Sequence, residues 1–363
     1  MSEAVASRQK PLTDDLRSRK IDKSVKAKPA KQAKPAKLYS FSTSDMKKSN
    51  LKILFGLVVF LALFPVVVLN VGAIGHYLDV MIFVGIYSLI NMGLSLLMGY
   101  AGQISLGHAA FFGLGAYTSG ILCTKLSLSP WLAMVAGVLL TALVAYIVGV
   151  PSLKLKGHYL AMATLGFGVI VYIFFNEEVA LTGGPSGFSD IPGLTIFGLD
   201  LDNDLYYYIL VWSLVLLILV FSLNVINSRI GRALRSLHDS AVAADAMGVE
   251  TSRFKVIIFV LSGAYASLAG SLYTHYVGFL SPSSFDLFLS IKLVMMVVVG
   301  GMHNIWGALL GTWLLTFLGN EWLHVFRDFD ILVYGAVLLA IVMFLPEGLV
   351  DLTPKMRRLL RRS

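Results

Sequence analysis

Three polar side chains, Gln103, Ser105 and His108, stand in a run that glycines interrupt, GYAGQISLGHAAFFGLGAYT at 99–118. Amide, hydroxyl and imidazole groups offer hydrogen bonds without a fixed charge, which suits the passage of a small polar solute. At membrane depth, irregular backbone is tolerated only where it is buried in protein or lines a cavity. We therefore predict that Gln103, Ser105, Gly107 and His108 form part of a translocation pathway, and helix packing alone is the alternative.

A second patterned stretch, residues 227–253, connects two apolar runs. Apolar residues recur there at three- and four-residue steps, at Ile230, Leu234, Leu237 and Ala241. This period predicts an amphipathic helix, and Gly248 supplies a C-terminal stop after it. Such a helix can lie on a lipid surface or dock into a partner protein. Because the stretch carries little net charge, we favour a groove on a partner protein.

Local patterns for catalysis or metal binding are absent from the sequence. No two of the seven histidines lie three or four residues apart, the spacing that places two ligands on one helical face. No Gly-x-x-x-x-Gly-Lys-Ser/Thr loop is present to hold nucleotide phosphates, so any ATP hydrolysis must come from another chain. The single cysteine, Cys123, lies in an apolar run and is interpreted as a buried hydrophobe. An enzyme would have to assemble its site from distant residues, such as His158 with Glu177.

The composition excludes an ordinary water-soluble enzyme. Hydrophobic residues make up 57% and charged residues 14% of the 363 residues, against roughly 45–50% and 25% in soluble domains. The first 50 residues carry 13 Lys or Arg and 5 Asp or Glu, which accounts for the whole formal charge of +8. The body is therefore not basic, and nucleic-acid binding is not expected. Residues 1–46 are predicted to be a disordered Lys-rich tail, with attraction to anionic lipid headgroups as the alternative role.

Apolar runs of membrane-spanning length follow one another from Leu51 onward. A helix needs about 20 residues to cross a hydrocarbon core of ~30 Å. We predict an all-α polytopic membrane protein with a permease domain at 47–346 and about ten transmembrane helices, near 51–72, 78–98, 104–124, 131–150, 158–176, 205–226, 254–277, 288–302, 305–323 and 330–346. The third and eighth runs are rich in glycine, so either is compatible with a half-helix.

The distribution of charge predicts the orientation, because Lys and Arg favour cytoplasmic loops. The loop 227–253 and the C-terminal tail 347–363 are rich in Arg, whereas the loop 177–204 holds six acids and neither Lys nor Arg. We therefore expect both termini and 227–253 in the cytoplasm and 177–204 outside. The spans hold few ionisable groups, which disfavours proton or sodium coupling. Small residues at four-residue spacing predict close helix packing at Ala109–Gly113, Ala116–Gly120, Ala266–Gly270 and Gly307–Gly311.

Several collinear motifs run through the chain: GYAGQISLGHAAFFGLGAY at 99–117, GHYLAMATLGFGVI at 157–170, RALRSLHDSAVAADAMGVETSRFK at 232–255 and VVGGMHNIWGALLG at 298–311. Together they resemble the M-type permease subunit of branched-chain amino acid ABC importers, from about Leu78 to Leu345. The Lys-rich tail is not part of this similarity. Near 301–308 the chain has Met-His-Asn and Gly-Ala where many relatives have Gly/Ser and Gly-Pro.

The resemblance implies a lipid-embedded pore formed with an H-type permease as a heterodimer. It also implies two ATP-binding subunits, which hold ATP and Mg²⁺, and an extracytoplasmic substrate-binding protein, in a bacterial cytoplasmic (inner) membrane. No cofactor and no enzymatic activity are expected of this chain.

The coupling helix would transmit the motion of the ATPases through Arg232, Arg235, Leu237, Asp239, Ala244, Met247 and Gly248. Branched-chain amino acids are the expected substrates. A urea or short-amide permease is the alternative, and a stand-alone ion-coupled carrier is a less favoured one.

Overall fold

The computed structural model describes residues 43–70, 76–155, 157–196, 199–201 and 203–322, and isolated positions at 335, 336, 339, 343, 348 and 349. The chain divides into a unit of residues 1–58 and a unit of residues 59–363, with the boundary inside helix α1 (Thr43–Asn70). The predicted tails 1–46 and 347–363 and the predicted last span 330–346 lie outside the described residues, apart from residues 43–46 and those isolated positions.

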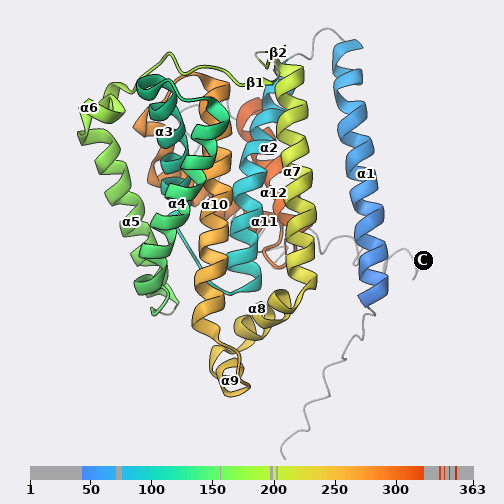
Figure 1. The fold of residues 1–363 in the computed structure, drawn as a ribbon. Helices are drawn as coiled ribbons and strands as arrows, with labels where there is room; N and C mark the ends of the chain where they lie inside the picture. The colour runs from blue at the N-terminus through green and yellow to red at the C-terminus, as the bar shows by residue number, and fades with distance from the viewer. Residues whose placement is uncertain are drawn as a thin grey trace, which may run out of the picture. The chain divides into compact units, whose positions relative to one another are not determined.

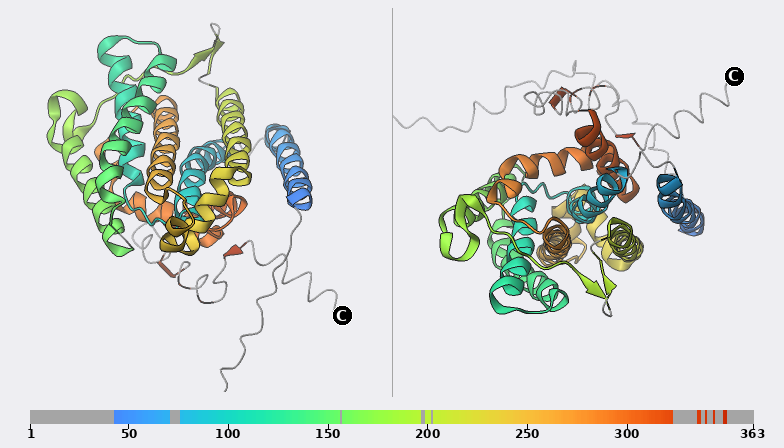
Figure 2. Two further views of the ribbon diagram at one scale, coloured as in Figure 1. Left: turned by 60° about the horizontal axis from the view of Figure 1, so that its bottom comes forward. Right: turned by 90° about the horizontal axis from the view of Figure 1, so that it is seen from above.

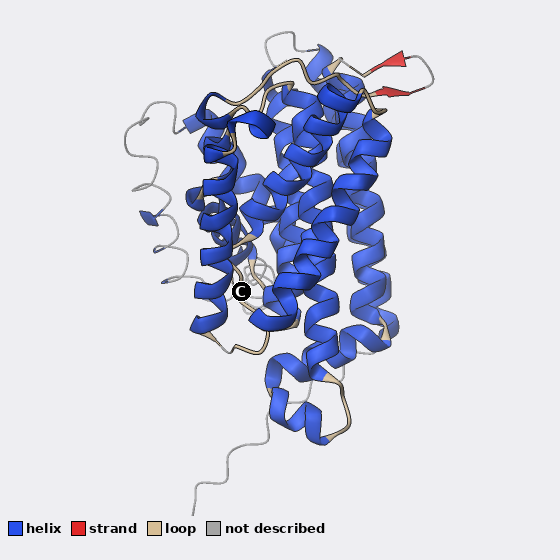
Figure 3. Cartoon of the chain, turned by 60° about the vertical axis from the view of Figure 1, so that its left-hand side comes forward, coloured by secondary structure: helices blue, strands red, loops and turns tan. Residues whose placement is uncertain are grey.

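Apolar helices dominate the described residues (Figure 1). The longer ones after α1 are α2 (His76–Ser95), α3 (His108–Leu126), α4 (Pro130–Ser152), α5 (His158–Glu177), α7 (Asp204–Asn227), α10 (Thr251–Val277), α11 (Leu287–Gly300) and α12 (Ile305–Phe317). Shorter elements are α6 (Val179–Thr182), α8 (Arg229–Asp239), α9 (Ala241–Ala246), the π-helical turns η1 (Leu96–Tyr100) and η4 (Leu318–Trp322), and the 3₁₀ turns η2 (Gly184–Ser186) and η3 (Pro282–Phe285). Strands β1 (Thr195–Ile196) and β2 (Leu199–Asp200) form one small antiparallel hairpin (Figure 3).

The prediction of an all-α polytopic membrane protein is confirmed. Seven helical stretches of the described residues are long and apolar enough to cross a membrane, at Asn50–Val68, His76–Tyr100, Pro130–Ser152, His158–Glu177, Asp204–Asn227, Thr251–Val277 and Pro282–Gly300. The predicted runs 104–124 and 305–323 correspond to α3 and to the shorter α12, which are not in that set. The number of about ten spans therefore stays a prediction.

Helices α2 and α10 form the interior of the unit of residues 59–363. Helix α10 packs against α2, α3 and α4, and α2 packs in addition against α7 and α12. Seen from above, α7 and α10 are viewed nearly along their axes, whereas α11 is seen from its side and runs across them (Figure 2). Large apolar side chains are exposed on α4, α5 and α7, as expected of helices that face lipid.

Glycines let neighbouring backbones touch at the centre of this arrangement. A Cβ atom added to Gly270 of α10 would lie 2.0 Å from the carbonyl oxygen of Phe112 in α3. One added to Gly311 of α12 would lie 2.0 Å from the carbonyl oxygen of Met296 in α11. The predicted packing role of Ala266–Gly270 and Gly307–Gly311 is thus confirmed, because only glycine permits these approaches.

We expect Gly270→Ala to lower the free energy of unfolding by about 1–3 kcal/mol, because the methyl group of the alanine would meet backbone atoms of α3 that have no room to shift. Thermal unfolding of the purified protein in detergent measures the effect. The matched control is Gly166→Ala in α5, where an added Cβ meets no atom within 4 Å. Equal melting temperatures for the two variants would contradict the close contact between α3 and α10.

Candidate functional site

The helix that begins as α2 breaks at the predicted pathway segment. After the π-helical turn η1, Gly102 adopts a φ of +64°, and the backbone stays irregular until α3 begins at His108. The amide of Gln103 donates to the carbonyl of Leu97 at 3.0 Å, which closes the turn. Figure 1 shows the connection running from the lower end of α2 to an α3 that begins higher in the bundle. Irregular backbone therefore enters the protein interior here.

Hydroxyl groups from two other helices satisfy the backbone of this break. The amide of Leu106 donates to Oγ1 of Thr164 in α5 at 3.0 Å, and the amide of Ala109 donates to Oγ of Ser290 in α11 at 3.1 Å. Gly107 lies so close to α5 that an added Cβ would be 2.6 Å from the carbonyl oxygen of Thr164. The break is thus buried against protein, the condition under which a membrane tolerates it.

The side chain of His108 joins the start of α3 to α10 by a hydrogen bond. Its side chain is buried, with Nε2 2.6 Å from Oγ of Ser262, while Nδ1 has no hydrogen-bond partner among the described residues. A second pair joins the same two helices farther along, where the Ser119 hydroxyl lies 2.8 Å from Nε2 of His275. Nδ1 of His275 is 2.7 Å from the carbonyl oxygen of Pro192. Because a carbonyl only accepts, Nδ1 carries the proton and Nε2 accepts from Ser119.

The four predicted pathway residues do not share one environment. Ser105, Gly107 and His108 are buried by the chain's own helices, whereas Gln103 is partly exposed and donates from Nε2 to the carbonyl of Ala101 at 3.2 Å. The residues that bond to this segment at Leu106, His108 and Ala109 escaped the sequence analysis because they lie 58 to 181 residues away along the chain: Thr164, Ser262 and Ser290. No local spacing could have signalled them.

The predicted amphipathic helix is α8, and its apolar face is turned toward its own chain. Leu234 and Leu237 are buried, and α8 packs against α7, α10 and η1. This apolar face is therefore packed against the chain's own helices at Leu234 and Leu237, and docking of the segment to a partner protein stays a prediction. The cause of this packing is the sharp turn after α7, where Arg235 donates from Nη2 to the carbonyl of Ile226 at 2.7 Å and Gly231 has no space for a Cβ.

Helix α9 carries the exposed apolar surface of the segment instead. The side chains of Val242 and Met247 are 71% and 85% exposed, whereas Ala244 is buried. Oδ1 of Asp245 accepts a hydrogen bond of 2.7 Å from the hydroxyl of Thr251, which fixes α9 to the start of α10. Figure 1 shows α8 and α9 at the lower end of the bundle.

Gly248 ends α9 in the left-handed conformation, with a φ of +81°. The amide of Val249 donates to the carbonyl of Ala244 and the amide of Gly248 to that of Asp245, both at 3.0 Å. These two bonds define a Schellman motif, which favours glycine at this position. An added Cβ would meet no atom within 4 Å, so the backbone angle alone requires glycine.

The predicted coupling segment and the predicted pathway segment meet at a joint beneath the helix break. Nδ1 of His238 in α8 would be 2.9 Å from a Cβ added to Gly102, and its Nε2 lies 3.4 Å from Nε2 of His303 in the turn between α11 and α12. A cavity of about 210 Å³ at this joint is lined by Gly99, Tyr100, Arg235, His238, Asp239 and His303. No group of three or more His, Cys, Asp or Glu side chains within the described ranges could hold a metal ion. Through His238, helix α8 is in direct contact with the helix break.

The opposite end of the bundle holds an acidic cavity that the sequence analysis missed. It has a volume of about 460 Å³ and is lined by Asp79, Phe83, Leu201, Asp204, Tyr207, His275 and Tyr276. The Tyr276 hydroxyl donates to Oδ1 of Asp79 and lies 3.4 Å from Oδ1 of Asp204. The sequence indicates this cavity only by one aspartate at the start of each of two apolar runs, Asp79 and Asp204. Two carboxylates in one cavity attract the cationic group of a ligand.

Comparisons with known proteins bear on what this arrangement does. A family model described as the branched-chain amino acid transport system permease component matches residues 76–342. The high-affinity branched-chain amino acid transport system permease protein LivM of Escherichia coli is 33% identical over 291 residues, covering 74% of this chain and 68% of the relative. LivM of Salmonella typhimurium is 31% identical over the same shares. The permease protein LivH of Salmonella typhimurium is 25% identical, covering 72% of this chain and 90% of the relative. No solved structure matches the chain significantly.

We expect Ser262→Ala to reduce the free energy of unfolding by about 1–2 kcal/mol, because it leaves both ring nitrogens of the buried His108 without a partner. Thermal unfolding in detergent reports the change. Ser213→Ala is the matched control, since that exposed serine bonds only to the carbonyl of Ile209 in its own helix. A stability loss no larger than that of the control would show that the His108–Ser262 pair does not hold α3 to α10.

Proposed function

Because the chain belongs to the family of branched-chain amino acid transport permease components, we propose that it is the M-type permease subunit of an ABC importer for branched-chain amino acids. In this proposal an H-type permease completes the pore as a heterodimer. Two separate ATP-binding subunits bind ATP and Mg²⁺, and a substrate-binding protein delivers the amino acid from outside. The match over residues 76–342 supports the assignment, because it covers the apolar helices of the bundle.

The proposed orientation places both termini and the α8–α9 segment in the cytoplasm of a bacterial inner membrane. Arg residues concentrated in 227–253 and 347–363 support this orientation, as does the absence of Lys and Arg from 177–204 in the sequence. The acidic cavity between α2, α7 and α10 would then open toward the outside, where substrate arrives.

The observation that carries the proposal is the contact between α8 and the helix break. In our mechanism an ATP-binding subunit holds the exposed surface of α9, and its motion passes through α8 to His238, Gly102 and His303. The exposed residues Arg232, Asp239 and Met247 would contact the ATP-binding subunit. The remaining coupling residues would position that surface: Arg235, Leu237, Ala244 and Gly248.

We propose that the break itself is the moving part of the pathway. Displacing Gln103, Ser105, Gly107 and His108 would exchange their contacts with α5, α10 and α11 and open a route along α3. If these residues serve packing alone, variants that keep the protein folded would transport normally.

The outer cavity supports an amino acid over a urea or short-amide substrate. Asp79 and Asp204 would attract the ammonium group of a zwitterion, whereas urea and amides are neutral. The aromatic walls, Phe83, Tyr207 and Tyr276, suit an aliphatic side chain. Urea and short amides remain the alternative substrates.

Reconstitution of the complete transporter in proteoliposomes tests the function. We expect leucine uptake to require ATP, the ATP-binding subunits, the H-type permease and the binding protein, and urea not to compete. The chain reconstituted alone should be inactive, since it has no nucleotide-binding loop. Uphill leucine uptake by the chain alone under a proton or sodium gradient would identify an ion-coupled carrier and refute the proposal.

We expect Gly248→Asn to keep most of the ATP-driven uptake and Gly248→Val to lower it about tenfold. Asparagine tolerates the left-handed conformation, whereas a β-branched residue at a φ of +81° is strained by about 1–3 kcal/mol. Uptake is measured at equal amounts of assembled transporter. The two variants should differ little if the conformation at the end of α9 plays no part in coupling.

A further inference from the structure

An apolar groove runs along the outside of the bundle between α4, α7 and α10. It has a volume of about 900 Å³, and its lining includes Tyr146, Val150, Phe221, Val225, Val256 and Ile257. Tyr146, Phe221 and Ile257 are 55%, 49% and 42% exposed, so the described part of the chain leaves this apolar surface uncovered. The acyl chain of a bilayer lipid can pack along an apolar groove of this kind through van der Waals contacts.

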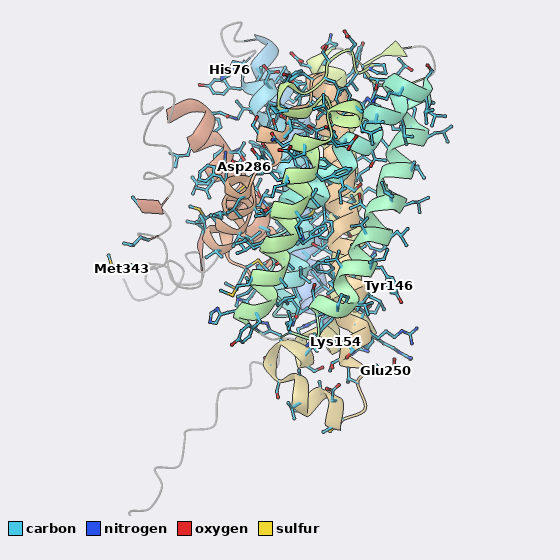
Figure 4. All side chains as sticks on the ribbon, turned by 90° about the vertical axis from the view of Figure 1, so that its left-hand side faces the viewer. His76, Tyr146, Lys154, Glu250, Asp286 and Met343 are labelled. Atoms are coloured by element: carbon cyan, nitrogen blue, oxygen red, sulfur yellow. The ribbon has the colours of Figure 1, made fainter. Side chains whose placement is uncertain are left out.

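Basic side chains stand at one end of this groove. Lys154, Arg253 and the hydroxyl-bearing Ser252 line it there, at the end where α8 and α9 lie. Figure 4 shows Lys154 below Tyr146, toward the end of the bundle where Glu250 lies. The groove is thus apolar along its length and cationic at its mouth.

These cations are available to a ligand. Among the residues that the structure describes, Lys154 forms no ion pair, and the ion pair of Arg253 is with Glu250, with 3.5 Å between Nη1 and Oε2. Both members of that pair are more than 70% exposed, so solvent screens their attraction and the pair is weak. Phosphate oxygens placed between Lys154 and Arg253 would bind both cations.

We propose that this groove binds an anionic phospholipid of the inner leaflet, with its phosphate at Lys154 and Arg253 and an acyl chain along Tyr146, Val150 and Ile257. Basic pockets between transmembrane helices on the cytoplasmic side are typical sites for anionic headgroups. A helix of another membrane protein would cover the apolar surface but would need carboxylates opposite both bases. The charge of the mouth therefore favours the lipid.

The bound lipid would also touch the coupling segment, since Ile230 in the first turn of α8 lines the same groove. The choice of leaflet rests on the proposed function, which places α8 and α9 in the cytoplasm. Binding of the lipid itself does not depend on transport.

Native mass spectrometry of the transporter complex tests the site. The complex is taken from nanodiscs of phosphatidylcholine with or without phosphatidylglycerol, and retained lipids are counted. We expect the double variant Lys154→Gln/Arg253→Gln to retain about tenfold less phosphatidylglycerol. Arg229→Gln is the matched control, because Arg229 is an exposed base at the same end that does not line the groove. Equal retention by the double variant and the control would overturn the proposal.

A photo-crosslinking residue, p-benzoylphenylalanine, in place of Ile257 distinguishes the lipid from a protein occupant. An adduct with the mass of a phospholipid supports the proposal, whereas an adduct to another chain of the complex overturns it. Neither readout requires uptake. If the reconstituted transporter fails to import leucine but still retains phosphatidylglycerol, only the proposed function is wrong.

Discussion

The structure depends on one requirement of a hydrocarbon environment: a backbone amide without a partner costs several kcal/mol there. The break between α2 and α3 exposes such amides in the interior, and hydroxyls of Thr164 and Ser290 accept from them. Helices α5 and α11 must lie where they do to supply these groups. The position of the break thus specifies the packing around it as much as hydrophobicity does.

Contacts within the chain also determine how α8 and α9 of the predicted coupling segment are held. Because Leu234 and Leu237 of α8 are buried and the helix packs against α7, α10 and η1, α8 is part of the bundle. Helix α9 projects Val242 outward, and its C-terminal end is held by the Asp245–Thr251 bond and by the turn at Gly248. In the proposed mechanism, a force applied to α9 would reach His238 in α8 through Ser240, which caps α9.

Much of this architecture can be predicted from the sequence. Continuous hydrophobicity predicts α2, α3, α4, α5, α7, α10 and α11 to within a few residues at each end, because a span must hold about 20 apolar residues. Periodicity correctly predicts that α8 is amphipathic, yet it cannot say which surface covers its apolar face. The His108–Ser262 and Ser119–His275 pairs could not be predicted, since their partners lie more than 150 residues apart. The acidic cavity was hidden because Asp79, Asp204 and Tyr276 meet only in three dimensions.

Backbone contact through glycine also limits how the molecule can deform. A Cβ on Gly115 would lie 2.2 Å from the carbonyl oxygen of Ser267, and Gly270 meets Phe112 as closely. Side chains can slide past one another by changing rotamer, but interlocked backbones cannot. The middle of α3, where Phe112 and Gly115 lie, must consequently move with α10 as one rigid block. The movement needed for a conformational cycle is then left to the hydrogen bonds accepted by Thr164 and Ser290, which join the break and the start of α3 to α5 and α11 and can break and re-form.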